Sequence, residues 1–155
     1  MRILSVTAVS LIAALAFGGT AAATTKSEFI RRGDALCART MKELAPLRRR
    51  AEAAASAPES QKWALATSLW SDQIRIQMRF NERLRAIGTP RGDAAARNLL
   101  SRLDRGVVLA RRVRDAFASR RTAGVANALE AYVDFTLALN KRIRAYGFRV
   151  CGGSL

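Results

Sequence analysis

The stretch VANALEAYVDFTLALNKRIRAY, residues 125–146, carries an apolar residue or a threonine at every third or fourth position. That spacing places one stripe along one face of an α-helix, as in helices that pack against others. Gly147 follows at once, which is typical of a helix end, and Phe148 is expected to fold back onto the last turn. The stripe consists of Val125, Leu129, Tyr132, Thr136, Leu139, Ile143 and Tyr146. We therefore predict a helix from about Thr122 to Tyr146.

Similar stripes predict three further helices upstream. Their expected ranges are about Ser27–Ala45, about Glu59–Ile87 and about Asp93–Ser119. Ser27 and Asp93 are the predicted N-caps, and Gly88 with Pro90 ends the second helix. Pro46 either kinks the first helix or begins a short segment over Leu47–Ala55. No strand-type alternation occurs, so the fold class is all-α, an antiparallel up-down-up-down four-helix bundle.

The N-terminus reads as a secretory signal peptide, residues 1–23. Arg2 supplies a positive start, residues 3–19 are largely apolar, and Ala21-Ala22-Ala23 is a small-residue cleavage site. An uncleaved anchor helix is the alternative, but polar residues and glycines interrupt the apolar run. Cleavage leaves one domain, residues 24–155, with no further segment long enough to span a membrane. We expect a secreted or extracytoplasmic protein, in the periplasm or cell envelope.

Two cysteines stand near opposite ends of the predicted domain, Cys37 and Cys151. In an up-down-up-down bundle the start of the first helix and the end of the fourth lie at the same end, so the pair can meet. An even number of cysteines in a secreted chain favours one intramolecular disulfide. Two free thiols or an intermolecular bond are the alternatives. The bond closes a long loop, which in the chain-entropy model contributes about 4–5 kcal/mol.

Residues that carry catalysis or hold cofactors are scarce. Histidine is absent, which excludes an imidazole base and every histidine-dependent metal or haem site. Glu130 and Asp134 share a helical face, but that face lies away from the apolar stripe and reads as solvated surface. A hydrolase would need these acids, since paired catalytic carboxylates converge in a cleft. We expect no catalytic residues, no metal and no cofactor, and therefore no enzyme.

The basic charge is the strongest functional signal. The chain has 27 Lys and Arg against 12 Asp and Glu, a net charge of +15. The candidate anion-binding residues are Arg48, Arg49, Arg50, Arg111, Arg112, Arg120 and Arg121. The clusters at 48–50 and 120–121 are expected to converge at the end opposite the disulfide. Possible partners are lipid head groups or wall polymers, without a specific nucleic acid. A solvated face with an arginine-rich composition is the alternative.

Several polar side chains lie within the predicted apolar stripes. They either lie at the edge of the stripe and form hydrogen bonds with one another, or they line a small pocket between the helices. The candidate pocket residues are Trp63, Trp70, Gln73, Gln77, Asn81 and Thr136. Gly106 in the third helix either permits a close approach or is tolerated at a cost of roughly 1 kcal/mol.

Two short motifs resemble those of a group of secreted or surface helical proteins from actinobacteria. The first is D-A-x-C, here Asp34-Ala35-Leu36-Cys37, and the second is a closing Y-G-x-x-x-C-G, here residues 146–152. Gly33 stands where the group would have Ala. The resemblance spans the mature chain and implies a disulfide-closed helical domain of the cell envelope. It implies no activity.

These observations lead to two functional expectations. The first is a secreted, non-enzymatic, strongly basic bundle that binds anionic surfaces or polymers, or serves a structural or interaction role. The second is a bundle that binds a small ligand in its internal polar seam. The sequence does not predict an oligomeric state.

Overall fold

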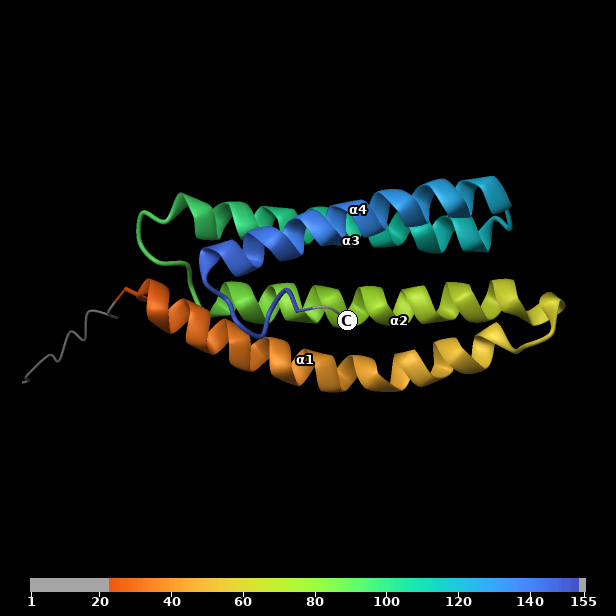
Figure 1. The fold of residues 1–155 in the computed structure, drawn as a ribbon, viewed down its shortest axis with the longest axis horizontal. Coiled ribbons are helices and arrows are strands. Elements are labelled where there is room, and N and C mark those ends of the chain that lie inside the picture. The colour runs from red at the N-terminus through yellow and green to blue at the C-terminus, as the bar shows by residue number, and fades with distance from the viewer. Residues whose placement is uncertain (1–22, 154–155) are drawn as a thin grey trace, which may run out of the picture.

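The computed structural model describes residues 23–153, which form four α-helices. These are α1 (Lys26–Ala55), α2 (Glu59–Ala86), α3 (Ala94–Ala118) and α4 (Thr122–Tyr146). Figure 1 shows the α1–α2 and α3–α4 turns at one end, with the α2–α3 loop at the other. The predicted all-α, antiparallel up-down-up-down bundle is confirmed. The predicted signal peptide lies outside the described residues except for Ala23, and none of the four helices is long and apolar enough to cross a membrane.

The helix ends follow local capping chemistry. Asp93 caps α3 as predicted, because its Oδ1 accepts a hydrogen bond from the backbone N of Ala96 at 2.9 Å. Ser27 was expected to cap α1, but Thr25 does so, with its Oγ1 accepting from the backbone N of Glu28 at 3.2 Å. Gly147 ends α4 with φ +123°, in the region that favours glycine.

Pro46 does not divide the first helix, so the predicted short second segment is not a separate element. α1 continues through it to Ala55 and curves gently in Figure 1. Ion pairs to α2 flank the proline on both sides. Glu43 pairs with Arg83 at 2.9 Å, and Arg50 pairs with Asp72 at 2.5 Å. These contacts lie on both sides of the proline and hold both halves of α1 against α2, although the proline itself cannot donate a hydrogen bond to the preceding turn.

The bundle is open along one side. Each helix packs against the next one in the sequence, but among the described residues no Cα of α1 lies within 8 Å of a Cα of α4. The main core cluster lies toward the α2–α3 loop, where Phe29, Leu36, Leu99 and Tyr146 are buried. The gap between α1 and α4 must therefore be closed by something other than direct helix packing.

The segment after α4 closes one half of this gap. Asp34 of α1 accepts three backbone hydrogen bonds from it: Oδ2 accepts from Arg149 N at 2.9 Å, and Oδ1 from Val150 N at 2.9 Å and Cys151 N at 3.0 Å. The Cys37–Cys151 disulfide lies beside these bonds, with a Cα–Cα distance of 5.4 Å. We call residues 147–153 the tail clamp. The predicted intramolecular disulfide is confirmed over free or intermolecular thiols.

An aromatic cluster anchors the beginning of the tail clamp. Phe148 is buried with its ring centroid 5.8 Å from that of Phe29, so it does fold back as predicted. The Tyr146 hydroxyl donates to Asp93 Oδ2 at 2.6 Å. Burial, together with this carboxylate, raises the pKa of Tyr146, and the tyrosine hydroxyl lowers the pKa of Asp93. The cap of α3 and the end of α4 are thus joined in one polar contact.

The carboxylate of Asp34 is predicted to hold the tail clamp together with the disulfide. Asp34→Ala removes the acceptor of three backbone N–H groups and should lower the free energy of unfolding by about 2 kcal/mol. Urea unfolding measures this change. Asp134→Ala is the matched control, since Asp134 is exposed on α4 with no hydrogen bond or ion pair among the described residues. Equal effects of the two substitutions would contradict the role given to Asp34.

Candidate functional site

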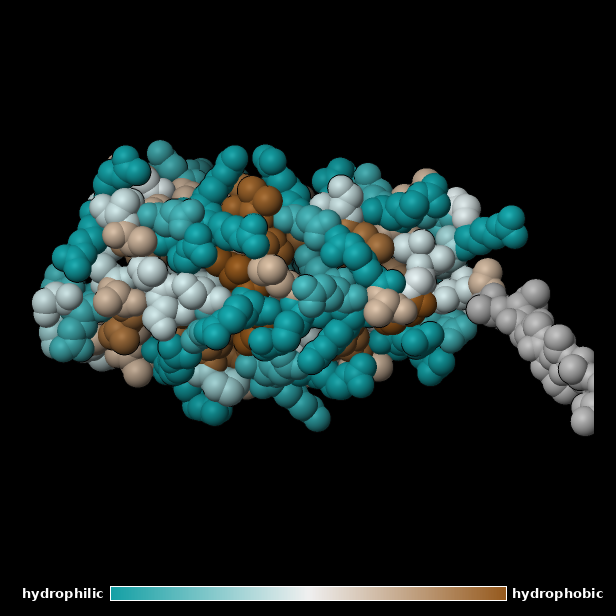
Figure 2. Space-filling view, turned by 180° about the vertical axis from the view of Figure 1, so that it is seen from behind, coloured by the Kyte–Doolittle hydropathy of each residue, from teal (hydrophilic) through white to brown (hydrophobic). Residues whose placement is uncertain are grey.

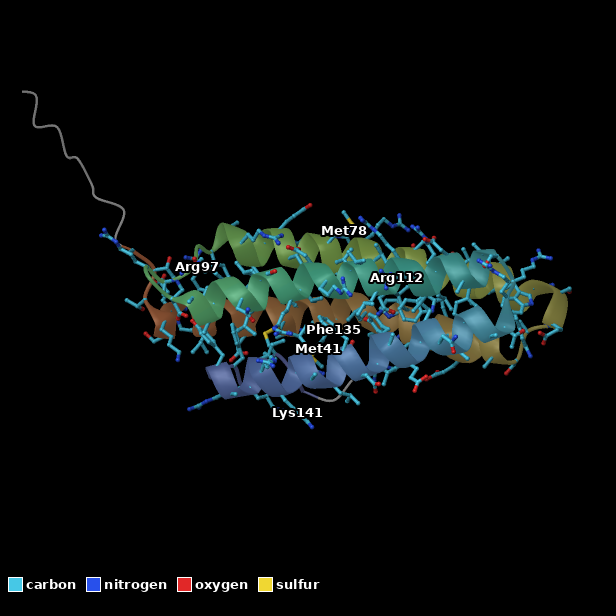
Figure 3. All side chains as sticks on the ribbon, turned by 90° about the horizontal axis from the view of Figure 1, so that it is seen from above. Met41, Met78, Arg97, Arg112, Phe135 and Lys141 are labelled. Carbon is cyan, nitrogen blue, oxygen red and sulfur yellow. A yellow bond between two sulfur atoms is a disulfide. The ribbon has the colours of Figure 1, made fainter. Side chains whose placement is uncertain are left out.

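The gap between α1 and α4 contains a cleft of about 200 Å³ that extends as far as the tail clamp. Its walls are mainly apolar side chains from all four helices and from the tail clamp. Met41 and Leu44 come from α1, and Phe135 and Leu139 come from α4. Figure 3 shows Met41 and Phe135 near the middle of the bundle, and both line this cleft. The geometry is that of a concave apolar site on a helical bundle, a common location for ligands.

The rim of the cleft carries large apolar side chains exposed to solvent. Met41 of α1 and Val150 of the tail clamp line the cleft and are 43% and 40% exposed. Arg144 of α4 donates to the carbonyl oxygen of Gly152 in the tail clamp at 2.6 Å. Val133 and Leu137 of α4 are also exposed but lie outside the cleft lining, on the helix flank that bears Arg144.

Polar groups gather at the base of the cleft. Gln73 Nε2 donates to the Tyr132 hydroxyl at 2.9 Å, and burial raises the pKa of Tyr132. Thr136 Oγ1 donates to the Tyr132 carbonyl oxygen at 2.8 Å. Gln77 Oε1 is buried and has no hydrogen-bond partner within the described part of the chain. An unpaired buried acceptor costs about 1–3 kcal/mol, so this oxygen marks a place where a partner would be favoured.

Gly106 of α3 makes room for Gln77. A Cβ at residue 106 would lie 2.9 Å from Gln77 Nε2 and 3.6 Å from a ring carbon of Phe135. The glycine thus admits a side chain of α2 into the space between α2 and α4. The structure therefore supports the prediction that Gly106 permits a close approach, rather than being merely tolerated. The group that approaches is the side-chain amide of Gln77, not the backbone of a neighbouring helix.

Half of the predicted pocket residues line the cleft. Gln73, Gln77 and Thr136 do so. Trp63, Trp70 and Asn81 do not: Trp63 packs against Phe117 with centroids 6.0 Å apart, and Trp70 packs edge-on against Tyr132 at 5.0 Å. Asn81 Nδ2 donates to Asp104 Oδ1 at 3.3 Å. These three side chains pack against residues of α3 and α4, so they are not part of the lining of this cleft.

The three consecutive arginines of α1 point in different directions. Arg50 is held against α2 by Asp72 and Ser68. Arg48 and Arg49 are exposed and form no ion pair among the described residues. Arg48 follows Leu44 by one helical turn, so it starts from the flank that borders the cleft, whereas Arg49 starts from the solvent side. The three side chains therefore differ in direction and in ion pairing, and a shared anion site at 48–50 stays a prediction.

The remaining candidate arginines lie on α3 and in the turn that follows it. Arg120 and Arg121 are exposed in the α3–α4 turn, at the same end of the bundle as the α1–α2 turn (Figure 1). Their convergence with the arginines at 48–50 into one anion site stays a prediction. Arg111 Nη2 contacts Met78 Sδ at 3.3 Å, and Arg112 is exposed on α3 (Figure 3).

The acids considered for catalysis lie apart from the cleft. Glu130 and Asp134 are exposed on the outer face of α4. In the described part of the chain no group of three or more acidic or sulfur side chains is placed to hold a metal ion. Searches against family models, curated proteins and solved structures found no significant match for this chain. The cleft geometry therefore carries the functional argument.

Two glutamines one turn apart should respond in opposite ways to the same substitution. Gln73→Leu breaks the bond to the Tyr132 hydroxyl and should lower the free energy of unfolding by about 1 kcal/mol. Gln77→Leu removes an acceptor without a partner, so stability should stay unchanged or rise. Urea unfolding of the ligand-free protein compares them. A loss for Gln77→Leu as large as that for Gln73→Leu would contradict the assigned contacts.

Proposed function

We propose that this protein is a secreted, non-enzymatic bundle of the cell envelope that binds a small, mainly apolar molecule in the α1–α4 cleft. The observation that carries the proposal is a cleft with apolar walls and a bare apolar rim, closed at one end by the tail clamp. The location is supported by the apparent signal peptide and by the disulfide, since disulfides persist in oxidising compartments.

The chemistry of the cleft favours a ligand over bulk water. Exposed apolar side chains of the lining, such as Met41 and Val150, lose contact with water when a ligand covers them, which contributes roughly 25 cal/mol per Å². The few polar groups at the base, Gln77 and the Gln73–Tyr132 pair, are suited to orienting a ligand. Apolar walls with a few placed polar groups are the usual composition of ligand sites.

An uncharged apolar dye tests the cleft without assuming the ligand. N-phenyl-1-naphthylamine, whose emission rises in apolar surroundings, should bind saturably at one molecule per chain. Thr136→Phe fills the cleft and should weaken binding about tenfold or more, which is about 1.4 kcal/mol. Fluorescence titration measures both.

The control places the same ring on the opposite face of the same helix. Ala138 is exposed on α4 and points away from the cleft, so Ala138→Phe should leave dye binding unchanged. The proposal fails if the unmodified protein shows no saturable binding, or if the two phenylalanine variants weaken binding equally.

A stripe of unpaired arginines supports a second candidate function, attachment to an anionic surface. Arg97, Arg105 and Arg112 recur on the outer face of α3, are exposed, and form no ion pair in the described chain. Figure 2, seen from behind, shows a mostly hydrophilic surface with apolar side chains between the polar ones. Three cations on one face favour an extended polyanion or lipid surface.

Salt dependence tests this second function. Binding to vesicles that contain phosphatidylglycerol should weaken markedly between about 50 and 200 mM salt, because exposed charges are screened. Replacing Arg97, Arg105 and Arg112 by Gln should weaken it further in sedimentation assays. Vesicle binding that is unchanged both by added salt and by the three substitutions would refute the electrostatic mechanism.

A further inference from the structure

The cleft is elongated. Its lining extends from Tyr132 to Ile143 on α4 and from Gln73 to Leu84 on α2, in each case twelve residues of helix with a rise of roughly 16 Å at 1.5 Å per residue. Most of the side chains along it are apolar. An extended hydrocarbon chain matches this length and this lining.

The two ends of the cleft differ. Phe148, Cys151 and Gly152 of the tail clamp line one end, and the disulfide holds them there. The lining reaches Leu44 on α1 toward the other end, and Arg48 lies one helical turn beyond it. A chain whose apolar tip rests against the clamp therefore has its other end beside an arginine.

The charges around this open end favour an anion. Arg48 is exposed and has no ion-pair partner among the described residues. Glu52, four residues on along the same flank, is exposed and forms no ion pair with it. On α4 the acids Glu130 and Asp134 face outward, away from the cleft. Arg48 is thus the cation placed to meet a ligand head group, with Glu52 as a local opposing charge.

We infer that the ligand is a single-chain amphiphile with a carboxylate head group. Its hydrocarbon chain lies along the cleft, with its tip at the tail clamp, and its carboxylate lies at Arg48. The inference rests on the proposed binding function of the cleft, and it adds the ligand class and the orientation. It also separates Arg48 from Arg49 and Arg50, which the sequence presents as one cluster.

A set of three ten-carbon ligands tests the head-group preference. Decanoate, 1-decanol and decyltrimethylammonium share one chain and differ in charge, and each competes with N-phenyl-1-naphthylamine below its micelle concentration at pH 8. Decanoate should bind about three- to fivefold more tightly than decanol, as expected for an exposed ion pair. Decyltrimethylammonium should bind most weakly.

Variants at neighbouring arginines locate the effect. Arg48→Gln should abolish the difference between decanoate and decanol, and Arg48→Glu should reverse the order of decanoate and decyltrimethylammonium. Arg49→Gln is the matched control: it removes the same charge from an exposed position on the solvent side of α1 and should keep the preference. Glu52→Gln should strengthen decanoate binding.

Each other outcome has a defined meaning. Equal displacement by decanoate and decanol would overturn the carboxylate inference and leave the cleft as a ligand site. Equal effects of Arg48→Gln and Arg49→Gln would also overturn it, because the preference would then follow net charge. Failure of all three ligands to displace bound dye would overturn the chain placement. A dimer in light scattering that excludes the dye would assign the cleft to a second copy.

Discussion

The bundle depends on the clamp between α1 and the segment after α4. Asp34 accepts hydrogen bonds from three successive backbone N–H groups, and Cys37 is joined to Cys151 beside it. Because α1 and α4 have no Cα pair within 8 Å, the clamp supplies the connection that helix packing supplies on the other three sides. A disulfide across so long a loop contributes about 4–5 kcal/mol in the chain-entropy model, and the carboxylate fixes the path of the tail locally.

The clamp acts on one half of the gap only, and this produces the functional site. Near the disulfide the tail fills the space between α1 and α4, and its last described residues line the end of the cleft. Farther along, Met41 of α1 and Phe135 of α4 line the gap, and Met41 remains exposed. A fully packed bundle would bury such side chains against one another. The clamp joins α1 to the end of α4, and an apolar cleft remains between the two helices.

Local periodicity and capping chemistry were sufficient to predict the four helices, their order and the disulfide. The cap by Thr25 was missed, because adjacent hydroxyl residues compete for that role. The sequence left open whether Pro46 kinks the first helix or begins a second segment, because the outcome depends on contacts to α2. The motif D-A-x-C includes Asp34, and only the folded tail shows that its carboxylate binds backbone amides. Which α2 side chains line the cleft depends on tertiary packing. The sequence therefore placed Gln73 and Gln77 in the pocket correctly, but it also placed there Trp63 and Trp70, which pack elsewhere. Tertiary packing also distinguishes Arg48, Arg49 and Arg50, which are consecutive in the sequence but lie on different flanks of α1.

Nuclear Overhauser effects between methyl groups test the central claim most directly. In the protein mixed with decanoate, the methyl groups of Met41, Thr136 and Leu139, which line the cleft, should show contacts to the methylene protons of the ligand. In the ligand-free protein the methyl groups of Met41 and Thr136 should show no contact, because the cleft separates α1 from α4. Direct contacts between those two methyl groups without ligand, and none to decanoate, would show a closed bundle and contradict the account.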